Sequence, residues 1–217
     1  MQVLSVNVAK PIVVPSKDGD VLTGIYKLPI QGPVMARNTN INGDGQADLR
    51  NHGGLDKAVY AFPHEHYDFY QSCLDQQPAE YGYFGENFTV EGMLESEVRI
   101  GDQFILGEAV FEVSQPRSPC FKLAIKFGDA DVVKIMVDSG KTGFYLRVLK
   151  EGMIQAGRVK PVFSNTSALT VAQVHQLMYV DILNVDMLKK STDSSALSDS
   201  WRGQFSSRLN KLGFSEI

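Results

Sequence analysis

Cys120 stands in the segment of this sequence whose residue types are best suited to chemistry, Q-P-R-S-P-C-F-K-L. Pro116 and Pro119 lack an N–H, so they stop a preceding strand and predict a stiff loop before a helix. Arg117, Lys122 and the N-terminal end of that helix place positive charge near the sulfur, which favours the thiolate over the thiol. A thiolate can ligate a metal or act as a nucleophile. The alternative is a cysteine that is buried as a small hydrophobe.

A second polar segment, residues 50–60, contains the glycine pair Gly53 and Gly54. Paired glycines let backbone N–H groups converge on an anion, and the side chains of Arg50, His52 and Lys57 could add positive charge. Such a nest suits a cofactor that carries a phosphate. A simple glycine turn between two strands explains the same residues equally well.

Asn87 is the third candidate, because it lies in a polar pair between aromatic residues of a β-rich region. Its amide can both donate and accept hydrogen bonds, which would suit a residue that orients a substrate. The competing interpretation is a turn in which the asparagine side chain caps the backbone.

The composition limits which chemistry is available. The 217 residues include only two cysteines, too few for an iron–sulfur cluster or a structural zinc site of the usual kind, and no haem is expected. Electrons for a redox reaction would therefore have to arrive from another protein or cofactor. The net charge of −4 argues against recruitment to nucleic acid or to anionic membranes. No signal peptide or membrane span is evident, so we expect a cytoplasmic protein in which Cys73 and Cys120 are reduced.

The elements that must position these residues are mainly short strands. Residues 3–9, 21–30 and 144–149 form β-type runs, and the glycines at Gly101 and Gly107 predict two tight connections in the segment 98–115. Many strands at this spacing indicate a β-barrel or a sandwich. Residues 64–77 and 121–140 look helical instead, with Gly140 as the C-cap of the second helix. One apolar face in the strand region is predicted to contain Val98, Ile100, Phe104, Leu106, Phe111 and Val113.

The pattern changes after residue 163, and we divide the chain into a β-barrel domain, 1–163, and a three-helix domain, 164–217. Thr170 and Gln173 form a capping box at the start of the first helix. Residues 185–191 and 198–213 are the other two helices, and their positive and negative charges balance. A DNA-binding helical module would show a basic surplus, so this role is not expected.

Six segments, taken in order, resemble the MOSC domains, which are named after the C-terminal domain of molybdenum-cofactor sulfurase. The resemblance covers nearly the whole chain, although no single segment decides it. It is closest to the bacterial YiiM-like subgroup, whose members carry a C-terminal three-helix extension. The segments are 43–48, 52–59, 65–67, 85–87, 116–120 and 142–147.

The resemblance implies a MOSC-type β-barrel that holds a pterin-based molybdenum cofactor (molybdopterin). Cys120 matches the family cysteine that is taken to ligate molybdenum or to carry sulfur. The subgroup is associated with reducing N-hydroxylated compounds, including toxic hydroxylaminopurine base analogues, which is a detoxification role. Asn87 and His52 are candidates for orienting the substrate or assisting proton delivery. The candidate cofactor-binding residues besides Cys120 are Arg117, Ser118, Lys122, Gly53, Gly54, Lys57 and Arg147.

The expected partners are therefore an N-hydroxylated small molecule and an external reductase that donates electrons. The oligomeric state stays open, with a homodimer as one option. Two other functions remain open as well. In the first, Cys120 carries a persulfide and the protein is a sulfur carrier. In the second, the protein binds or stores the cofactor without catalysis.

Overall fold

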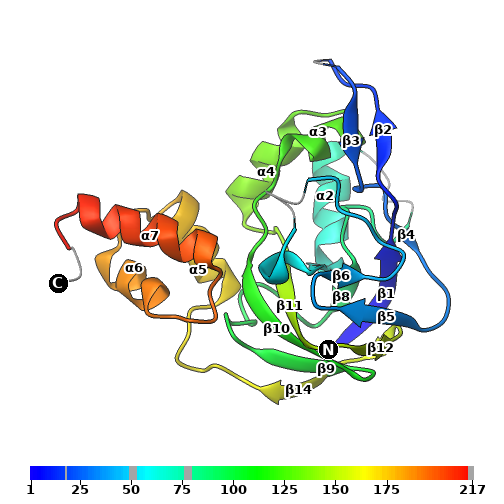
Figure 1. Ribbon diagram of the computed structural model, residues 1–217. Helices are drawn as coiled ribbons and strands as arrows, with labels where there is room; N and C mark the ends of the chain where they lie inside the picture. The colour runs from blue at the N-terminus through cyan, green and yellow to red at the C-terminus, as the bar shows by residue number, and fades with distance from the viewer. Residues whose placement is uncertain (18, 49–52, 76–79, 215–217) are drawn as a thin grey trace.

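In the computed structural model, a strongly curled mixed sheet forms the body of the chain and a group of helices stands beside it (Figure 1). The structure describes residues 1–17, 19–48, 53–75 and 80–214. In spatial order, the strands of the main sheet are β13 (Gly157–Arg158), β1 (Gln2–Val8), β8 (Phe88–Glu91), β7 (Val59–Pro63), β11 (Phe144–Lys150), β10 (Ala109–Pro116), β9 (Gln103–Leu106) and β14 (Lys160–Phe163), with β4 (Leu28–Pro29) paired to β1 off this path.

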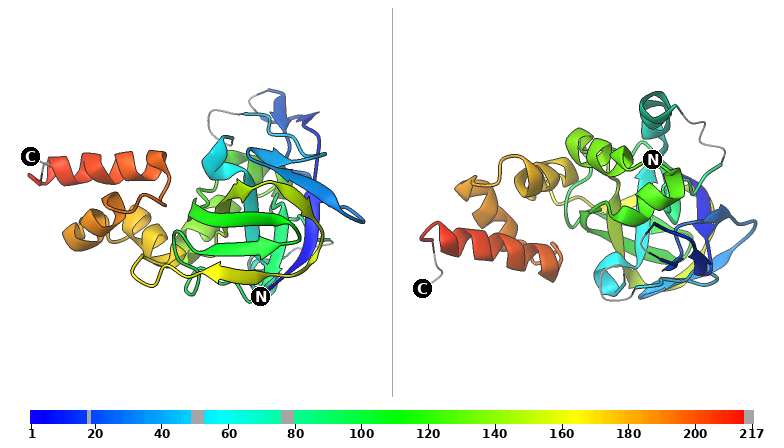
Figure 2. Two further views of the ribbon diagram at one scale, coloured as in Figure 1. Left: turned by 60° about the horizontal axis from the view of Figure 1, so that its bottom comes forward. Right: turned by 90° about the horizontal axis from the view of Figure 1, so that it is seen from above.

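The main sheet curls into a half-barrel. β7 and β8 pair in parallel, and the other strand pairs are antiparallel. β13 and β14 occupy opposite ends of the sheet, yet only Val159 separates them along the chain, so the two edges are brought close together (Figure 2, left). The predicted β-rich barrel with C-terminal helices is confirmed in this form.

The interior of the half-barrel is apolar. Gly107, in a left-handed conformation at φ 59°, turns β9 into β10 as predicted. Gly101 also makes a turn, but this turn lies ahead of β9 rather than between two paired strands. All six residues that were predicted to share an apolar face are buried in the core: Val98, Ile100, Phe104, Leu106, Phe111 and Val113.

Two small sheets flank the half-barrel. One contains β5 (Val34–Arg37), β6 (Asn40–Ile41) and β12 (Gly152–Ile154), and the other is the hairpin of β2 (Ile12–Val14) and β3 (Val21–Thr23). The prediction of one β-type run over 21–30 was wrong, because β3 ends at Thr23 and β4 begins at Leu28. At Gly24 a Cβ atom would lie 2.3 Å from the Gly45 carbonyl oxygen, so the chain leaves the ladder where two loops meet closely.

Three helices cover one side of the half-barrel (Figure 1): α2 (Tyr67–Leu74), α3 (Phe121–Phe127) and α4 (Asp131–Ser139). A short 3-10 turn, η2 (His64–His66), leads into α2, and residues 76–77 of the predicted helix lie outside the described residues. The single helix predicted over 121–140 was wrong. Gly128, at φ 66°, ends α3, and the Asp129 carboxylate accepts the N–H of Asp131 at the start of α4.

The C-terminal helices are α5 (Val171–Tyr179), α6 (Val185–Thr192) and α7 (Asp199–Lys211), as predicted. The capping box of Thr170 and Gln173 is present in both directions, and the side chains of Asn184 and Ser198 cap α6 and α7. Within the described residues, none of the helices has the length and apolar character to cross a membrane. Apolar side chains of the three helices join the core of the half-barrel, among them Val171, Leu188, Trp201 and Phe205.

Candidate functional site

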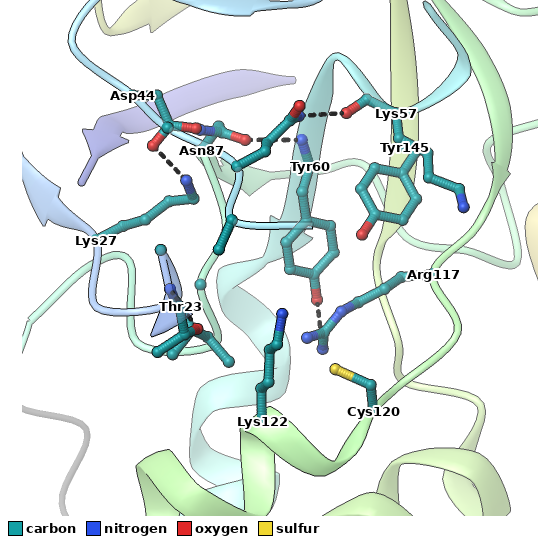
Figure 3. Close-up of a pocket in the computed structure, with 16 residues that line it drawn as sticks. Thr23, Lys27, Asp44, Lys57, Tyr60, Asn87, Arg117, Cys120, Lys122 and Tyr145 are labelled. Carbon is teal, nitrogen blue, oxygen red and sulfur yellow. Dashed lines mark hydrogen bonds and ion pairs between the residues drawn. The ribbon is translucent and has the colours of Figure 1, made fainter. Parts of the chain in front are cut away.

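A pocket opens beside the half-barrel, between the loop that follows β3, the loop that follows β6 and the start of α3 (Figure 3). It encloses about 580 Å³ of space, including the part that is open to solvent. The lining residues that matter for chemistry are Lys27, Asp44, Lys57, Tyr60, Asn87, Arg117, Cys120, Lys122 and Tyr145.

Cys120 is presented to this pocket by the predicted proline-framed loop. Strand β10 ends at Pro116, and Cys120 is the extended residue (φ −136°) directly before α3. Its half-buried side chain points into the pocket toward Arg117, and it forms no hydrogen bond among the described residues (Figure 3). Cys73 is exposed on α2 and does not line the pocket. Only one of the two thiols is therefore in a position to meet a ligand there.

Arg117 is a buried cation without an acidic partner in the described part of the chain. The residue is 5% exposed, and its guanidinium carbon lies 4.7 Å from the centre of the Tyr60 ring. Nη1 is 3.4 Å from the Tyr60 hydroxyl and 3.3 Å from the sulfur of Met136. The ion pairs formed among the described residues do not include Arg117. Because a buried charge is costly unless it is paired, this part of the pocket is suited to an anionic ligand.

Lys122 adds a second positive charge on the same side. Its side chain rises from α3 toward Arg117 and Tyr60 (Figure 3). No hydrogen bond or ion pair involves its ammonium group within the described residues. The thiol and two cations thus come from one segment of eight residues, 115–122.

Tyr60 and Tyr145 form an aromatic wall beside these cations, with ring centres 5.4 Å apart. The Tyr60 hydroxyl donates to the Thr142 carbonyl at 2.7 Å. Burial raises the pKa of Tyr60 well above its ordinary value, although Arg117 opposes that shift. Burial also raises the pKa of Tyr145, again against Arg117. Both rings therefore offer neutral hydroxyl groups at physiological pH.

The opposite wall of the pocket contains an internally satisfied charge pair. Lys27 and Asp44 form an ion pair whose side chains are 8% and 1% exposed. The Asp44 carboxylate also accepts the Ala9 N–H at 2.9 Å and the Asn87 amide at 3.0 Å. Burial lowers the pKa of Lys27, while Asp44 raises it. The charges of Lys27 and Asp44 therefore compensate each other. The positive charges that lack an acidic partner among the described residues, Arg117 and Lys122, lie on the side of Cys120.

Asn87 lines the pocket, but its amide is engaged by the protein. Oδ1 accepts the Tyr60 N–H at 3.1 Å, and Nδ2 donates to the Asn7 carbonyl at 3.2 Å as well as to Asp44. The side chain thereby joins β1, β7 and the loop after β6. This geometry supports a positioning role for Asn87 more directly than contact with a substrate.

Other predicted site residues lie elsewhere. Arg147 does not line the pocket; its guanidinium contacts Asp56 at 2.5 Å, Glu112 at 3.0 Å and the Ala196 carbonyl at 2.6 Å. It therefore connects the half-barrel to the segment between α6 and α7. Ser118 is exposed and accepts a hydrogen bond from the Tyr179 hydroxyl of α5 at 3.2 Å.

The glycine segment is only partly at the pocket. Gly54, at φ 92°, precedes the short helix η1 (Leu55–Lys57), and neither Gly53 nor Gly54 lines the pocket. Lys57 does line it, and burial lowers its pKa against the charge of Asp56. His52 lies outside the described residues.

Among the nine lining residues that matter for chemistry, four were not predicted as site residues: Lys27, Asp44, Tyr60 and Tyr145. Asp44 and Tyr145 fall inside segments that carry the MOSC resemblance, and this was the only available signal. Lys27 lies in a segment that was interpreted as a strand.

The donor set of the pocket fits a group that joins a soft metal to an anionic tail. A thiolate sulfur is a preferred ligand of soft metals, and guanidinium and ammonium groups bind phosphate. The sulfur of Cys120 and the cations Arg117 and Lys122 provide both kinds of donor in one pocket.

The fold and the site together define a small half-barrel protein with an attached three-helix unit, in which one thiol and a buried cation share a pocket. The chain belongs to the MOSC domain family. The MOSC domain model matches residues 48–159, and a second family model, described as YiiM-like, 3-alpha helix domain, matches residues 169–212. MOSC domains are associated in general with binding of the molybdenum cofactor.

Relatives agree with this assignment and confirm the predicted resemblance. The uncharacterized protein YflK of Bacillus subtilis (strain 168) is 43% identical over 211 residues, which is 97% of this chain and 95% of that protein. A protein of Gibberella moniliformis named Reductase is 37% identical over 142 residues, which is 64% of this chain and 25% of that protein. The crystal structure of YiiM from Geobacillus stearothermophilus superposes with a TM-score of 0.82 at 35% identity, covering 96% of this chain and 98% of that one.

Proposed function

We propose that this protein is a molybdenum-cofactor-dependent reductase of N-hydroxylated compounds, in which Cys120 ligates the metal. The observation that carries the proposal is the geometry of the pocket. An accessible thiol lies beside Arg117, a buried cation that forms no ion pair with a carboxylate among the residues that the structure describes. Membership of the MOSC family and the relative named Reductase support an oxidoreductase.

The residues that would hold the cofactor divide by chemistry. The Cys120 sulfur is the soft ligand for molybdenum, and Arg117 and Lys122 are the cations for the anionic pterin phosphate, with Lys57 at the pocket wall. When bound, the cofactor supplies a two-electron redox centre that can accept an oxygen atom. The electrons come from an external reductase that this chain has to meet at its surface.

The reaction removes oxygen from nitrogen: the N–OH compound takes up two electrons and two protons and yields the amine and water. The chain's own residues would orient the substrate and hold a proton near the departing oxygen. The Lys122 ammonium points into the pocket for that role (Figure 3). Asn87 would act by fixing Tyr60 through its backbone N–H, and His52 remains a candidate for proton delivery. Neither nucleic acid nor a membrane takes part.

The test is metal analysis of protein made in a host that synthesises the cofactor. We expect about one molybdenum per chain in the wild type and in Cys73→Ala, and none in Cys120→Ala. Cys73→Ala is the matched control, because it removes an exposed thiol outside the pocket. The loaded protein should reduce a hydroxylaminopurine in the presence of a chemical electron donor. Wild-type protein that is active with a reductant but lacks molybdenum would defeat the proposal.

The same preparation distinguishes the two other functions. A sulfur carrier would show a cyanide-labile sulfur on Cys120, by mass spectrometry, in metal-free protein. A storage protein would contain molybdenum and would turn over none of the N-hydroxylated compounds.

A further inference from the structure

A buried acid–base pair, His66 and Glu95, lies behind the pocket without lining it. The two residues are 5% and 4% exposed, and Nε2 of His66 is 2.7 Å from a carboxylate oxygen of Glu95. Burying a carboxylate is costly, so a side chain in this position needs strong partners. The reaction proposed above does not use this pair.

The second carboxylate oxygen of Glu95 holds a turn of the main chain. It accepts the Gly143 N–H at 2.6 Å, just before strand β11 begins. Gly143 has a left-handed conformation at φ 68°, and a Cβ atom there would lie only 2.3 Å from the Ala61 carbonyl oxygen. The turn is thus packed tightly against β7, and Glu95 fixes it from the other side.

The turn at Thr142 and Gly143 also binds Tyr60 and Arg117, which form the cationic side of the pocket. The Thr142 carbonyl accepts the Tyr60 hydroxyl at 2.7 Å, and the Gly143 carbonyl accepts the backbone N–H of Arg117 at 3.1 Å. The Arg117 guanidinium then lies over the Tyr60 ring and within 3.4 Å of its hydroxyl (Figure 3). Glu95 is therefore connected through this turn to the Tyr60 hydroxyl and to the main chain of Arg117.

We propose that Glu95, oriented by His66, is a positioning residue that fixes Arg117 and Tyr60 and thereby sets the affinity of the pocket for an anionic ligand. The inference rests on the proposed function only in taking Arg117 as the group that binds the anion. Glu95 acts through the turn at Thr142 and Gly143, because it touches neither the pocket nor Cys120.

The chemistry of the pair predicts which substitutions are tolerated. In Glu95→Gln the amide oxygen can still accept the Gly143 N–H, and the amide N–H can donate to His66 in its other tautomer. Glu95→Ala removes both bonds. Asp102→Ala is the matched control: Asp102 is a buried carboxylate, 7% exposed, that accepts the N–H groups of Arg99 and Asn165 at 2.9 and 2.7 Å and does not line the pocket.

Two measurements on the full chain test the proposal. The first follows the Nε–H signal of Arg117 in nitrogen-15 NMR spectra, assigned by its loss in Arg117→Gln, and compares its exchange with water. The second measures binding of inorganic phosphate by titration calorimetry. We expect Glu95→Ala to speed exchange of the Arg117 signal and to weaken phosphate binding about tenfold, equivalent to about 1.4 kcal/mol. Glu95→Gln should resemble the wild type in both measurements.

The control and a double variant separate positioning from a general loss of stability. Asp102→Ala should lower the thermal midpoint while leaving the Arg117 signal and phosphate affinity unchanged. In the Arg117→Gln background, adding Glu95→Ala should not weaken phosphate binding further, because the two residues act in series. An Arg117 signal in Glu95→Ala that matches the wild type, or an equal response in Asp102→Ala, would overturn the proposal. If the Arg117 signal responds as expected but protein from a cofactor-competent host holds no molybdenum, the positioning role stands and the proposed function fails.

Discussion

Replacing Arg117 by methionine should stabilise the ligand-free protein. The residue is 5% exposed. Its guanidinium contacts the Tyr60 ring at 4.7 Å, worth about 2 kcal/mol when desolvated, makes two long contacts of 3.3 and 3.4 Å, and interacts with the neutral Tyr145 hydroxyl. Taking an ion of this size out of water costs several kcal/mol. Methionine keeps the length and the packing of the side chain without the charge. We expect the free energy of unfolding to rise by about 1–3 kcal/mol, which lies within the range of about 1–4 kcal/mol seen when buried ion pairs are replaced by apolar residues.

Arg147→Met is the matched control for this prediction. The same substitution there leaves the carboxylates of Asp56 and Glu112 without their partner, at a site where the arginine side chain is 17% exposed. The free energy of unfolding should fall by about 1–3 kcal/mol, because breaking a partly buried ion pair leaves uncompensated charge. For a chain of this size, 2 kcal/mol corresponds to a change of about 4–8 °C in the thermal midpoint. The two variants should therefore move in opposite directions.

Thermal and urea unfolding of the ligand-free proteins provide the measurement. Adding inorganic phosphate should stabilise the wild type, by about 2.7 kcal/mol at a hundredfold excess over the dissociation constant, and should have little effect on Arg117→Met. A lower thermal midpoint for Arg117→Met, like that of Arg147→Met, would show that the charge of Arg117 is already compensated in the free protein. The argument for an anion-binding pocket would then lose its basis.

Two further predictions concern the frame around the pocket. Gly143→Ala should destabilise the protein by about 3 kcal/mol or more in urea unfolding, because its Cβ would lie 2.3 Å from the Ala61 carbonyl oxygen. The control Gly128→Ala, at φ 66° with no atom within 4 Å of the added Cβ, should cost about 1–2 kcal/mol. Equal losses of stability in the two variants would contradict the close approach at Gly143. Burial lowers the pKa of Lys126 to about 8, below its ordinary value near 10.5, so the folded state binds fewer protons than the unfolded state between these values, and stability rises with pH there. The stability of the wild type relative to Lys126→Met should accordingly increase by up to about 3 kcal/mol between pH 7.5 and 10.5, as followed by urea unfolding, and a constant difference would show that this lysine is not desolvated in the fold.

The parts of the fold that were predictable from sequence are those with local causes. The loop that presents Cys120 follows from two prolines that cannot continue a strand, and these act within five residues of the sulfur. The start of α5 follows from the reciprocal bonds of Thr170 and Gln173, three residues apart. The apolar alternation around β9 and β10 likewise identified a buried face.

The roles of the two arginines were not predictable, because they depend on strand pairing. Arg147 on β11 lies opposite Glu112 on β10, and this register directs its side chain to Asp56 and Glu112 rather than to the pocket. Arg117 follows the last residue of β10, where no partner strand offers an acidic neighbour among the described residues. In sequence both are single basic residues near the end or middle of a β-type run. Only the register distinguishes a structural arginine from one that faces a ligand.

The charge distribution indicates how this pocket would recognise an anionic group. The chain has a net charge of −4, so its overall field does not attract anions. The positive charge of Lys27 is compensated by its ion pair with Asp44. Attraction must arise from the local pair of Arg117 and Lys122 beside Cys120. Charges that are partly buried are screened less by salt than exposed ones. Recognition of an anionic, sulfur-ligated group would therefore depend on the fixed positions of a few side chains, so the buried bonds that hold Arg117 and Tyr60 would matter as much as the residues that touch the ligand.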